Sequence, residues 1–215
     1  MNLTQIDLRL PYKHRYGDSF SPKTWCVPEL YWSYLRDYPT GNIEKVNIIV
    51  SDNSDDEESM SVSGFSEAYL LFDFETYFTS NKLDKKKMQL EAVHTGMMQI
   101  AEKEGWDTDP LLDAYSKCLK NNLEYQFDVG KLKSSSNRKY KIGFWCNWDI
   151  DVFELYWVLY DKNSNEIKRK KLIEREPFEG VFVYYLKWKW LNNTHVVIQN
   201  NYKYGKKESW EINIF

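Results

Sequence analysis

The most regular hydrophobic pattern in the chain is an alternation near its end, over residues 180–193 (GVFVYYLKWKWLNN). Every second position carries a large apolar side chain: Phe182, Tyr184, Leu186, Trp188 and Trp190. Alternation places these five on one side of an extended strand, whereas a helix would spread them around its circumference. The other side then carries Tyr185, Lys187 and Lys189. The pattern predicts a strand with one core face and one mixed face.

Two turn signals follow this predicted strand, at Asn192-Asn193 and at Gly205-Lys206. Used as two-residue hairpin loops, they place Trp188 opposite Val197 and Gln199 opposite Ile212. One predicted core face then collects side chains from three strands: Phe182, Trp188, Trp190, Val197, Trp210, Ile212 and Ile214. Because two independently chosen turns give one apolar face, the register supports a hairpin array.

Further alternating segments lie upstream, at 123–129, 139–146, 152–160 and 167–174. A four-residue turn at 162–165 places Lys168 opposite Leu159 and Arg169 opposite Val158. Residues 123–215 are therefore predicted to form an antiparallel meander of five to six strands.

The hydrophobic period changes in the middle of the chain. Leu83, Leu90, Val93, Met97 and Ile100 recur at helical spacing, which predicts a helix from residue 81 or 84 to Glu104, with Gly105 as its cap. Three lysines at 85–87 favour the later start, since cations are unfavourable in a first helical turn. A second helix starts at Thr108 or Asp109, has Pro110 in its first turn and ends near 121–122. The two helices form a predicted hairpin.

In the N-terminal part of the chain, the hydrophobic pattern predicts strands at 2–10, 43–50 and 59–79. Residues 12–39 are rich in aromatic side chains and either pack down as a cover or form a binding surface; packing is the favoured interpretation. The predicted fold is α+β, with N-terminal strands in 1–80, a helical hairpin in 81–122 and a C-terminal meander in 123–215. The meander is expected to pack against the hairpin within a single domain, 1–215.

Composition supports a folded chain, with 17% aromatic and 42% hydrophobic residues in 215. Neither a run of 18 apolar residues nor a signal-peptide pattern is present, so the sequence predicts a cytoplasmic protein without a membrane span. The three cysteines are far apart and odd in number, which favours buried thiols over disulfides. No spacing of cysteine or histidine indicates a metal site, and no cofactor is predicted.

An acidic segment at 51–59 offers the first candidate binding residues: Asp52, Asp55, Asp56, Glu57 and Glu58. Its spacing resembles the start of a calcium loop, but Glu57 and Ser63 stand where such a loop needs glycine and glutamate. Residues 1–130 hold 13 Lys and Arg against 22 Asp and Glu, so a basic partner is the expected complement.

No phosphate-binding glycine loop or hydrolase signature occurs, and no catalytic residue is assigned. Asp73, Glu75 and His94 are the side chains left for one alternative, a small-molecule or hydrolytic site in an aromatic-lined pocket between helices and sheet. A second alternative is single-stranded nucleic-acid binding through Lys168–Lys171, which the acidic pI of about 5.7 disfavours.

The favoured function is a non-enzymatic protein-binding module, because tyrosine and tryptophan are abundant and no catalytic set is apparent. A small, acidic α+β chain without motifs suits a bacterial toxin-neutralising (immunity-type) protein. Its candidate binding residues are the acidic segment together with Tyr185, Lys187 and Lys189.

Overall fold

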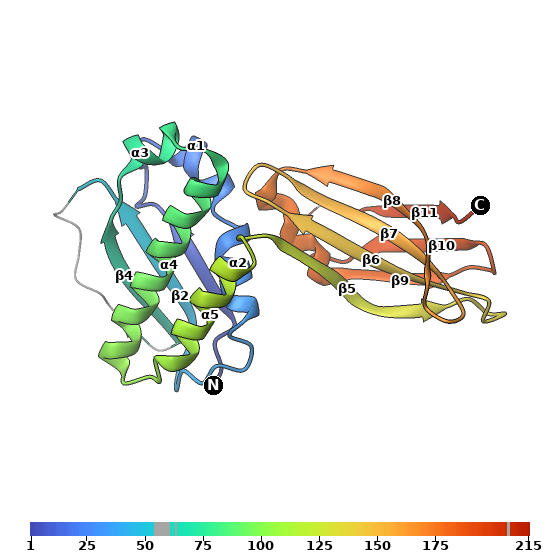
Figure 1. The fold of residues 1–215 in the computed structure, drawn as a ribbon, viewed down its shortest axis with the longest axis horizontal. Coiled ribbons are helices and arrows are strands. Elements are labelled where there is room, and N and C mark those ends of the chain that lie inside the picture. The colour runs from blue at the N-terminus through green and yellow to red at the C-terminus, as the bar shows by residue number, and fades with distance from the viewer. Residues whose placement is uncertain (54–60, 63, 206) are drawn as a thin grey trace. The chain divides into compact units, whose positions relative to one another are not determined.

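The computed structural model describes residues 1–53, 61–62, 64–205 and 207–215, and the chain divides into two compact units (Figure 1). Met1–Glu124 form the N-terminal unit and Tyr125–Phe215 the C-terminal unit. Together they contain helices, a mixed sheet and two antiparallel sheets, so the predicted α+β class is confirmed. The boundary lies where the predicted hairpin gives way to the C-terminal strands, and a single domain over 1–215 stays a prediction.

The N-terminal unit is built on a four-stranded mixed sheet in the order β1-β2-β4-β3. Strands β1 (Gln5–Arg9), β2 (Ile43–Ser51) and β4 (Gly64–Leu71) run parallel, and the short β3 (Ser61–Val62) pairs antiparallel with β4. The strand predicted over 59–79 is too long. It ends at Leu71, and Phe74–Thr79 form helix α3 instead, because the Asp73 side chain caps that helix by accepting from Thr76 N.

The predicted helical hairpin is confirmed as α4 (Lys82–Glu104) and α5 (Asp109–Lys120). Gly105 ends α4 in the left-handed conformation, at φ 71°, and Thr108 is the N-cap of α5. The expectation of a later start for α4 is wrong. Asn81 caps the helix by accepting from Asp84 N, and Lys86 is buried with its Nζ donating to Leu123 O, 3.1 Å away.

Helices α4 and α2 (Cys26–Ser33) pack on the N-terminal sheet, and Figure 1 shows α4 lying across β2 and β4. The strand side chains beneath them are apolar and buried: Ile6, Leu8, Val46, Ile48, Val50 and Ala68. The hairpin was expected to cover the C-terminal meander, whereas the sheet on which its helix α4 packs is the N-terminal one. The buried faces of β1, β2 and β4 need cover, and they are adjacent to the hairpin in the chain and in space.

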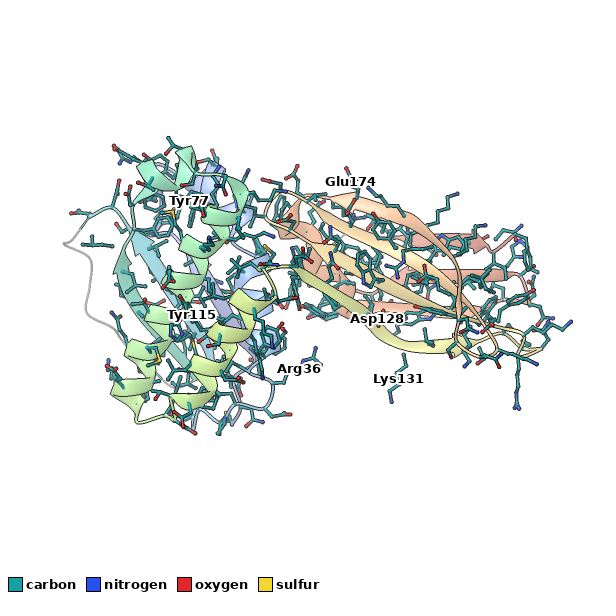
Figure 2. The ribbon with its side chains drawn as sticks, in the orientation of Figure 1. Arg36, Tyr77, Tyr115, Asp128, Lys131 and Glu174 are labelled. Atoms are coloured by element: carbon teal, nitrogen blue, oxygen red, sulfur yellow. The ribbon has the colours of Figure 1, made fainter. Side chains whose placement is uncertain are left out.

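Residues 12–39 pack down, as favoured from the sequence, and form α1 (Gly17–Phe20), the 3₁₀ turn η1 (Ser21–Lys23) and α2. Phe20 lies edge-on to Tyr77 of α3, with ring centroids 5.0 Å apart; Tyr77 is labelled in Figure 2. Tyr31 of α2 is fully buried. One aromatic residue of this stretch, Tyr12, remains 90% exposed.

The C-terminal unit contains two antiparallel sheets and not one continuous meander, which corrects the predicted arrangement. Four strands pair in chain order: β5 (Tyr125–Ser134), β6 (Tyr140–Trp148), β7 (Phe153–Asp161) and β8 (Glu166–Arg175). The other sheet has the order β11-β10-β9, from β9 (Leu186–Trp190), β10 (His195–Asn200) and β11 (Ser209–Asn213). Side chains of both sheets meet inside the unit, where Phe144 lies edge-on to Trp188 at 4.9 Å.

The strand predicted over 180–193 begins only at Leu186, because Pro177–Tyr185 form the 3₁₀ helix η2. Pro177, Gly180 and Val183 are buried at a spacing of three, the period of a 3₁₀ helix. Gly180 lies so close to the core that a Cβ there would be 2.6 Å from Phe153 and 2.7 Å from Trp148. This contact fixes the segment against the four-stranded sheet and separates the two sheets along the chain.

The predicted register between β9 and β10 is wrong by one residue. Trp188 lies opposite Ile198, so Val196 and Ile198 are buried where Val197 was expected. The cause is the turn: Leu191 N donates to His195 O, so three residues, 192–194, form the loop instead of two, and the Asn192 side chain accepts from the backbone N–H groups of Thr194 and His195. In contrast, the predicted pairing of Lys168 with Leu159 and of Arg169 with Val158 is confirmed.

We predict that Gly96→Ala destabilises the protein by about 1 kcal/mol, because a Cβ at residue 96 would lie 2.5 Å from Ile48 Cδ1. Overpacking of about 1–3 kcal/mol outweighs the gain of about 1 kcal/mol in helix propensity. Urea unfolding measures the change, and Gly17→Ala, with no atom within 4 Å of its Cβ, is the control. Ile48→Val removes Cδ1, the nearest of the clashing atoms, and leaves Cγ2 at 2.9 Å, so it should be less destabilising together with Gly96→Ala than alone. Additive effects of the two substitutions would contradict the close approach.

Candidate functional site

The side of the N-terminal sheet that faces away from α2 and α4 carries polar and aromatic side chains in three rows across the parallel strands. We call it the polar face. The rows follow the strand register and consist of Gln5–Lys45–Phe65, Asp7–Asn47–Glu67 and Arg9–Ile49–Tyr69. Side chains alternate along each strand. The strands that bury Leu8 and Ile48 under the helices therefore present Asp7, Asn47 and Glu67 on the opposite side.

Asp7 is the centre of an ion-pair group on this face. Lys45 Nζ lies 2.9 Å and Arg9 Nε 3.1 Å from its Oδ2, and Gln5 Nε2 donates to its Oδ1 at 2.9 Å. Burial raises the pKa of the Asp7 carboxyl, but the hydrogen bond from Lys45 and the charges of Arg9 and Lys45 outweigh it. The pKa therefore lies below its ordinary value, and Asp7 is a fixed anion that holds two cations in place.

A second group lies one strand further across the sheet, at Glu67. Its carboxylate accepts from Asn47 Nδ2 at 3.1 Å and from the Tyr69 hydroxyl at 2.8 Å, and both of these donors are neutral. Asn47 is only 4% exposed, and its Oδ1 is buried without a hydrogen-bond partner among the described residues. An unsatisfied buried acceptor is destabilising, so its presence between two carboxylates needs an explanation.

Glu67 and Asn47 border a hollow of about 340 Å³ on the polar face. The hollow is lined by the end of β1, the residues that follow it, and side chains of β2 and β4: Arg9, Leu10, Pro11, Tyr12, Asn47, Ile49, Glu67 and Tyr69. Its volume is at the small end of the range for ligand pockets, roughly 300–1,000 Å³. The polar face thus combines a hollow, a fixed ion-pair group and an acceptor without a donor.

The predicted acidic binding segment is only partly described. Asp55, Asp56, Glu57 and Glu58 lie outside the described residues. Asp52 directly follows β2, where His14 Nε2 lies 3.0 Å from its Oδ1 and Arg15 pairs with its other oxygen. The hydrogen bond from His14, together with the weaker influence of Arg15, lowers the pKa of the Asp52 carboxyl. Asp52 therefore already has one cationic neighbour, Arg15, and a hydrogen bond with His14 within the N-terminal unit.

The second predicted group, Tyr185, Lys187 and Lys189, belongs to two elements instead of one strand. Tyr185 is the last residue of η2, while Lys187 and Lys189 are exposed on β9. The Tyr185 ring lies 4.9 Å from that of Tyr202 and is 46% exposed. These residues are accessible, and their role in binding stays a prediction.

The basic segment considered for nucleic acid lies on β8, an edge strand, and several of its cations have partners within the unit. Arg169 pairs with Glu166 at 2.9 Å and lies over the Trp145 ring at 4.6 Å. Lys171 contacts both Glu154 and Glu174, and Lys168 donates to Ile214 O. These contacts already pair the lysine and arginine charges that would have to bind the phosphates of a nucleic acid.

The side chains considered for an enzymatic site do not gather. Asp73 caps α3 through Thr76, whose hydrogen bonds lower the pKa of the Asp73 carboxyl. His94 of α4 stacks on Tyr115, labelled in Figure 2, at 4.4 Å, and its Nδ1 lies 3.0 Å from the Tyr31 hydroxyl. Burial lowers the pKa of His94. A hollow of about 280 Å³ beside α4 is bordered by Asp73 but not by His94.

Within the described residues, no three His, Cys, Asp or Glu side chains are placed to hold a metal ion, and no helix is long and apolar enough to cross a membrane. All three cysteines are buried and none of them forms a disulfide, as predicted from their spacing. Burial raises the pKa of Cys118 to about 12.

The polar face was not predicted from the sequence. Asp7, Asn47 and Glu67 come from three separate strands, and their adjacency depends on parallel pairing across long connections. One signal was available: Asp7 and Asn47 are polar residues between apolar neighbours, and Glu67 lies between Ser66 and Ala68, in strands that were expected to be buried on one side. That signal gives a direction for each side chain but not the order of the strands.

We predict that Asp7→Asn lowers the free energy of unfolding by about 1–3 kcal/mol at pH 7, since it removes the anion that Lys45 and Arg9 share. The folded-state pKa is depressed, so this stabilisation is present above the unfolded value of about 3.9 and is lost as pH falls below it. Urea unfolding of both proteins at pH 7 and near pH 3 measures the difference. Asp113→Asn, which breaks only an exposed pair with Lys117, is the control. A cost for Asp7→Asn that is equal at both pH values would contradict the ion-pair account.

Comparison with protein-family models, with curated proteins and with solved structures finds no match to this chain. The function of the polar face therefore has to be inferred from its own side chains, hydrogen bonds and charges.

Proposed function

We propose that this chain is a non-enzymatic protein-binding module whose interface is the polar face of the N-terminal sheet. One observation carries the proposal. Three parallel strands have helices on one side, while the other side presents charged and aromatic side chains around a hollow. Parallel sheets are usually covered on both faces, so a partner that covers the second face would complete the usual arrangement.

The residue types on this face support a protein partner. Arginine and tyrosine dominate the energetics of protein interfaces, and Arg9, Tyr12 and Tyr69 all border the hollow. Asp7 holds Arg9 and Lys45 in position before any partner arrives. A preorganised surface loses less side-chain entropy on binding, which favours affinity.

The same contacts speak against proton transfer by these residues. A general base works best when its pKa lies near the working pH, whereas the pKa of Asp7 lies below its ordinary value. Its oxygens are also occupied by Lys45, Arg9 and Gln5. We therefore assign Asp7 a positioning role for the two cations.

The partner we propose is basic, and a bacterial toxin neutralised by this chain is the specific form of the proposal. Residues 1–130 have nine more acidic than basic side chains, from 22 against 13. Such an imbalance steers a partner of opposite charge and raises the rate of encounter. A gene for a basic toxin beside the gene for this chain would identify the first partner to try.

The test compares two tyrosines that are alike except for their position. Tyr12 borders the hollow and is 90% exposed with Lys13 near its ring; Tyr204 lies in the C-terminal unit and is 81% exposed with Lys203 near its ring. Affinity purification uses the full chain as bait, in wild-type, Tyr12→Ala and Tyr204→Ala forms. We expect one stoichiometric protein with the wild type and with Tyr204→Ala, bound about 30-fold more weakly by Tyr12→Ala.

Equal recovery by all three forms would place the interface elsewhere on the chain. Loss with Tyr204→Ala alone would move it to the C-terminal unit, beside Tyr185 and Tyr202. Either result would overturn the proposed interface. Both substitutions are at exposed positions, so a fold change is not the expected cause of lost binding.

A further inference from the structure

Two acceptor residues that border the hollow, Glu67 and Asn47, have no cationic partner among the described residues. Glu67 accepts only from the neutral Asn47 amide and Tyr69 hydroxyl in the part of the chain that the structure describes. Asn47 Oδ1, buried beside it, has no donor within the described residues. Arg9 also borders the hollow, but two hydrogen bonds hold its guanidinium on Asp7. The carboxylate and the carbonyl together therefore favour a group with several N–H donors and a positive charge.

The walls of the hollow suit a flat cation on an aliphatic stem. Tyr12, Pro11 and Ile49 line it with apolar surface, and Tyr69 adds a second aromatic ring next to Glu67. A guanidinium stacks on aromatic rings and is more weakly hydrated than an ammonium, so it loses less on leaving water. The volume of about 340 Å³ is sufficient for one side chain and small for a large cofactor.

We infer that this hollow is a socket for one arginine side chain of the partner, with its guanidinium bound by Glu67 and Asn47 Oδ1. The inference rests on the proposed function and specifies the chemistry of the partner at the centre of the interface. Asn47 Oδ1 is closed to solvent and has no donor among the described residues, so it gains its hydrogen bond when the Asn47 side chain turns toward the entering arginine. The charge of Glu67 is then paired, as a desolvated carboxylate requires.

The socket can be tested without the partner. The full chain, labelled with ¹⁵N, is titrated with N-acetyl-arginine methylamide and, separately, with the citrulline analogue, which has the same shape without the charge. We expect saturable shifts of the Asn47 side-chain amide with the arginine compound and about tenfold weaker binding of the citrulline compound. Glu67→Gln should weaken arginine binding about tenfold. Glu44→Gln, at an exposed position of the same strand as Asn47 and outside the lining, should leave it unchanged.

Absence of saturable shifts, equal binding of the two compounds, or equal effects of Glu67→Gln and Glu44→Gln would overturn the socket. Tyr12→Ala serves as a second variant, because its exposed side chain can be removed without loss of buried contacts, and it should also weaken arginine binding. A partner that depends on Tyr12 while the arginine compound does not bind would overturn the socket and keep the proposed interface. Arginine binding without any partner lost on Tyr12→Ala would overturn the proposed interface and keep the socket.

Discussion

The close packing of α4 on one side of the parallel strands is the constraint on which the N-terminal unit depends. Gly96 brings the helix within van der Waals distance of Ile48, and the buried side chains of β1, β2 and β4 are fixed to that side. Since neighbours along a strand point to opposite sides, the residues between them are forced outward together. The polar face, with its rows of Asp7, Asn47 and Glu67, is the direct consequence of how the helix packs.

Elements with strong local signals were predictable. Helices α4 and α5 follow from apolar residues at helical spacing and from the caps at Gly105 and Thr108, whereas the cap at Asn81, where α4 begins, was missed. The pairing of Lys168 with Leu159 and of Arg169 with Val158 was predicted from a loop of turn-forming residues between two alternating segments, although the register shifts on either side of the central pairs. In each case the interactions that determine the element join residues close in the sequence, so the element can be predicted from the local sequence pattern.

Elements that depend on distant contacts were not predictable. The segment 177–185 alternates like a strand, but Gly180 packs against Trp148 and Phe153 and the chain coils there into a 3₁₀ helix. The β9–β10 register depends on the Asn192 side chain taking two backbone donors, which lengthens the loop and reverses the facing of Val196 and Val197. The candidate site was not predicted from the sequence for the same reason: Asp7, Asn47 and Glu67 become neighbours only through the parallel pairing of their strands.

The two groups on the polar face differ in a way that bears on function. Asp7 is satisfied by two cations and an amide from its own unit, so it adds stability and holds the surface in one arrangement. Glu67 and Asn47 have hydrogen bonds but, among the described residues, no cation, and the Asn47 carbonyl has no donor at all. An unsatisfied acceptor costs about 1–3 kcal/mol in the free chain, and an apolar residue of similar size at that place would avoid the cost. The cost is understandable if the bound state recovers it, and a donor-rich cation on the polar face would do so.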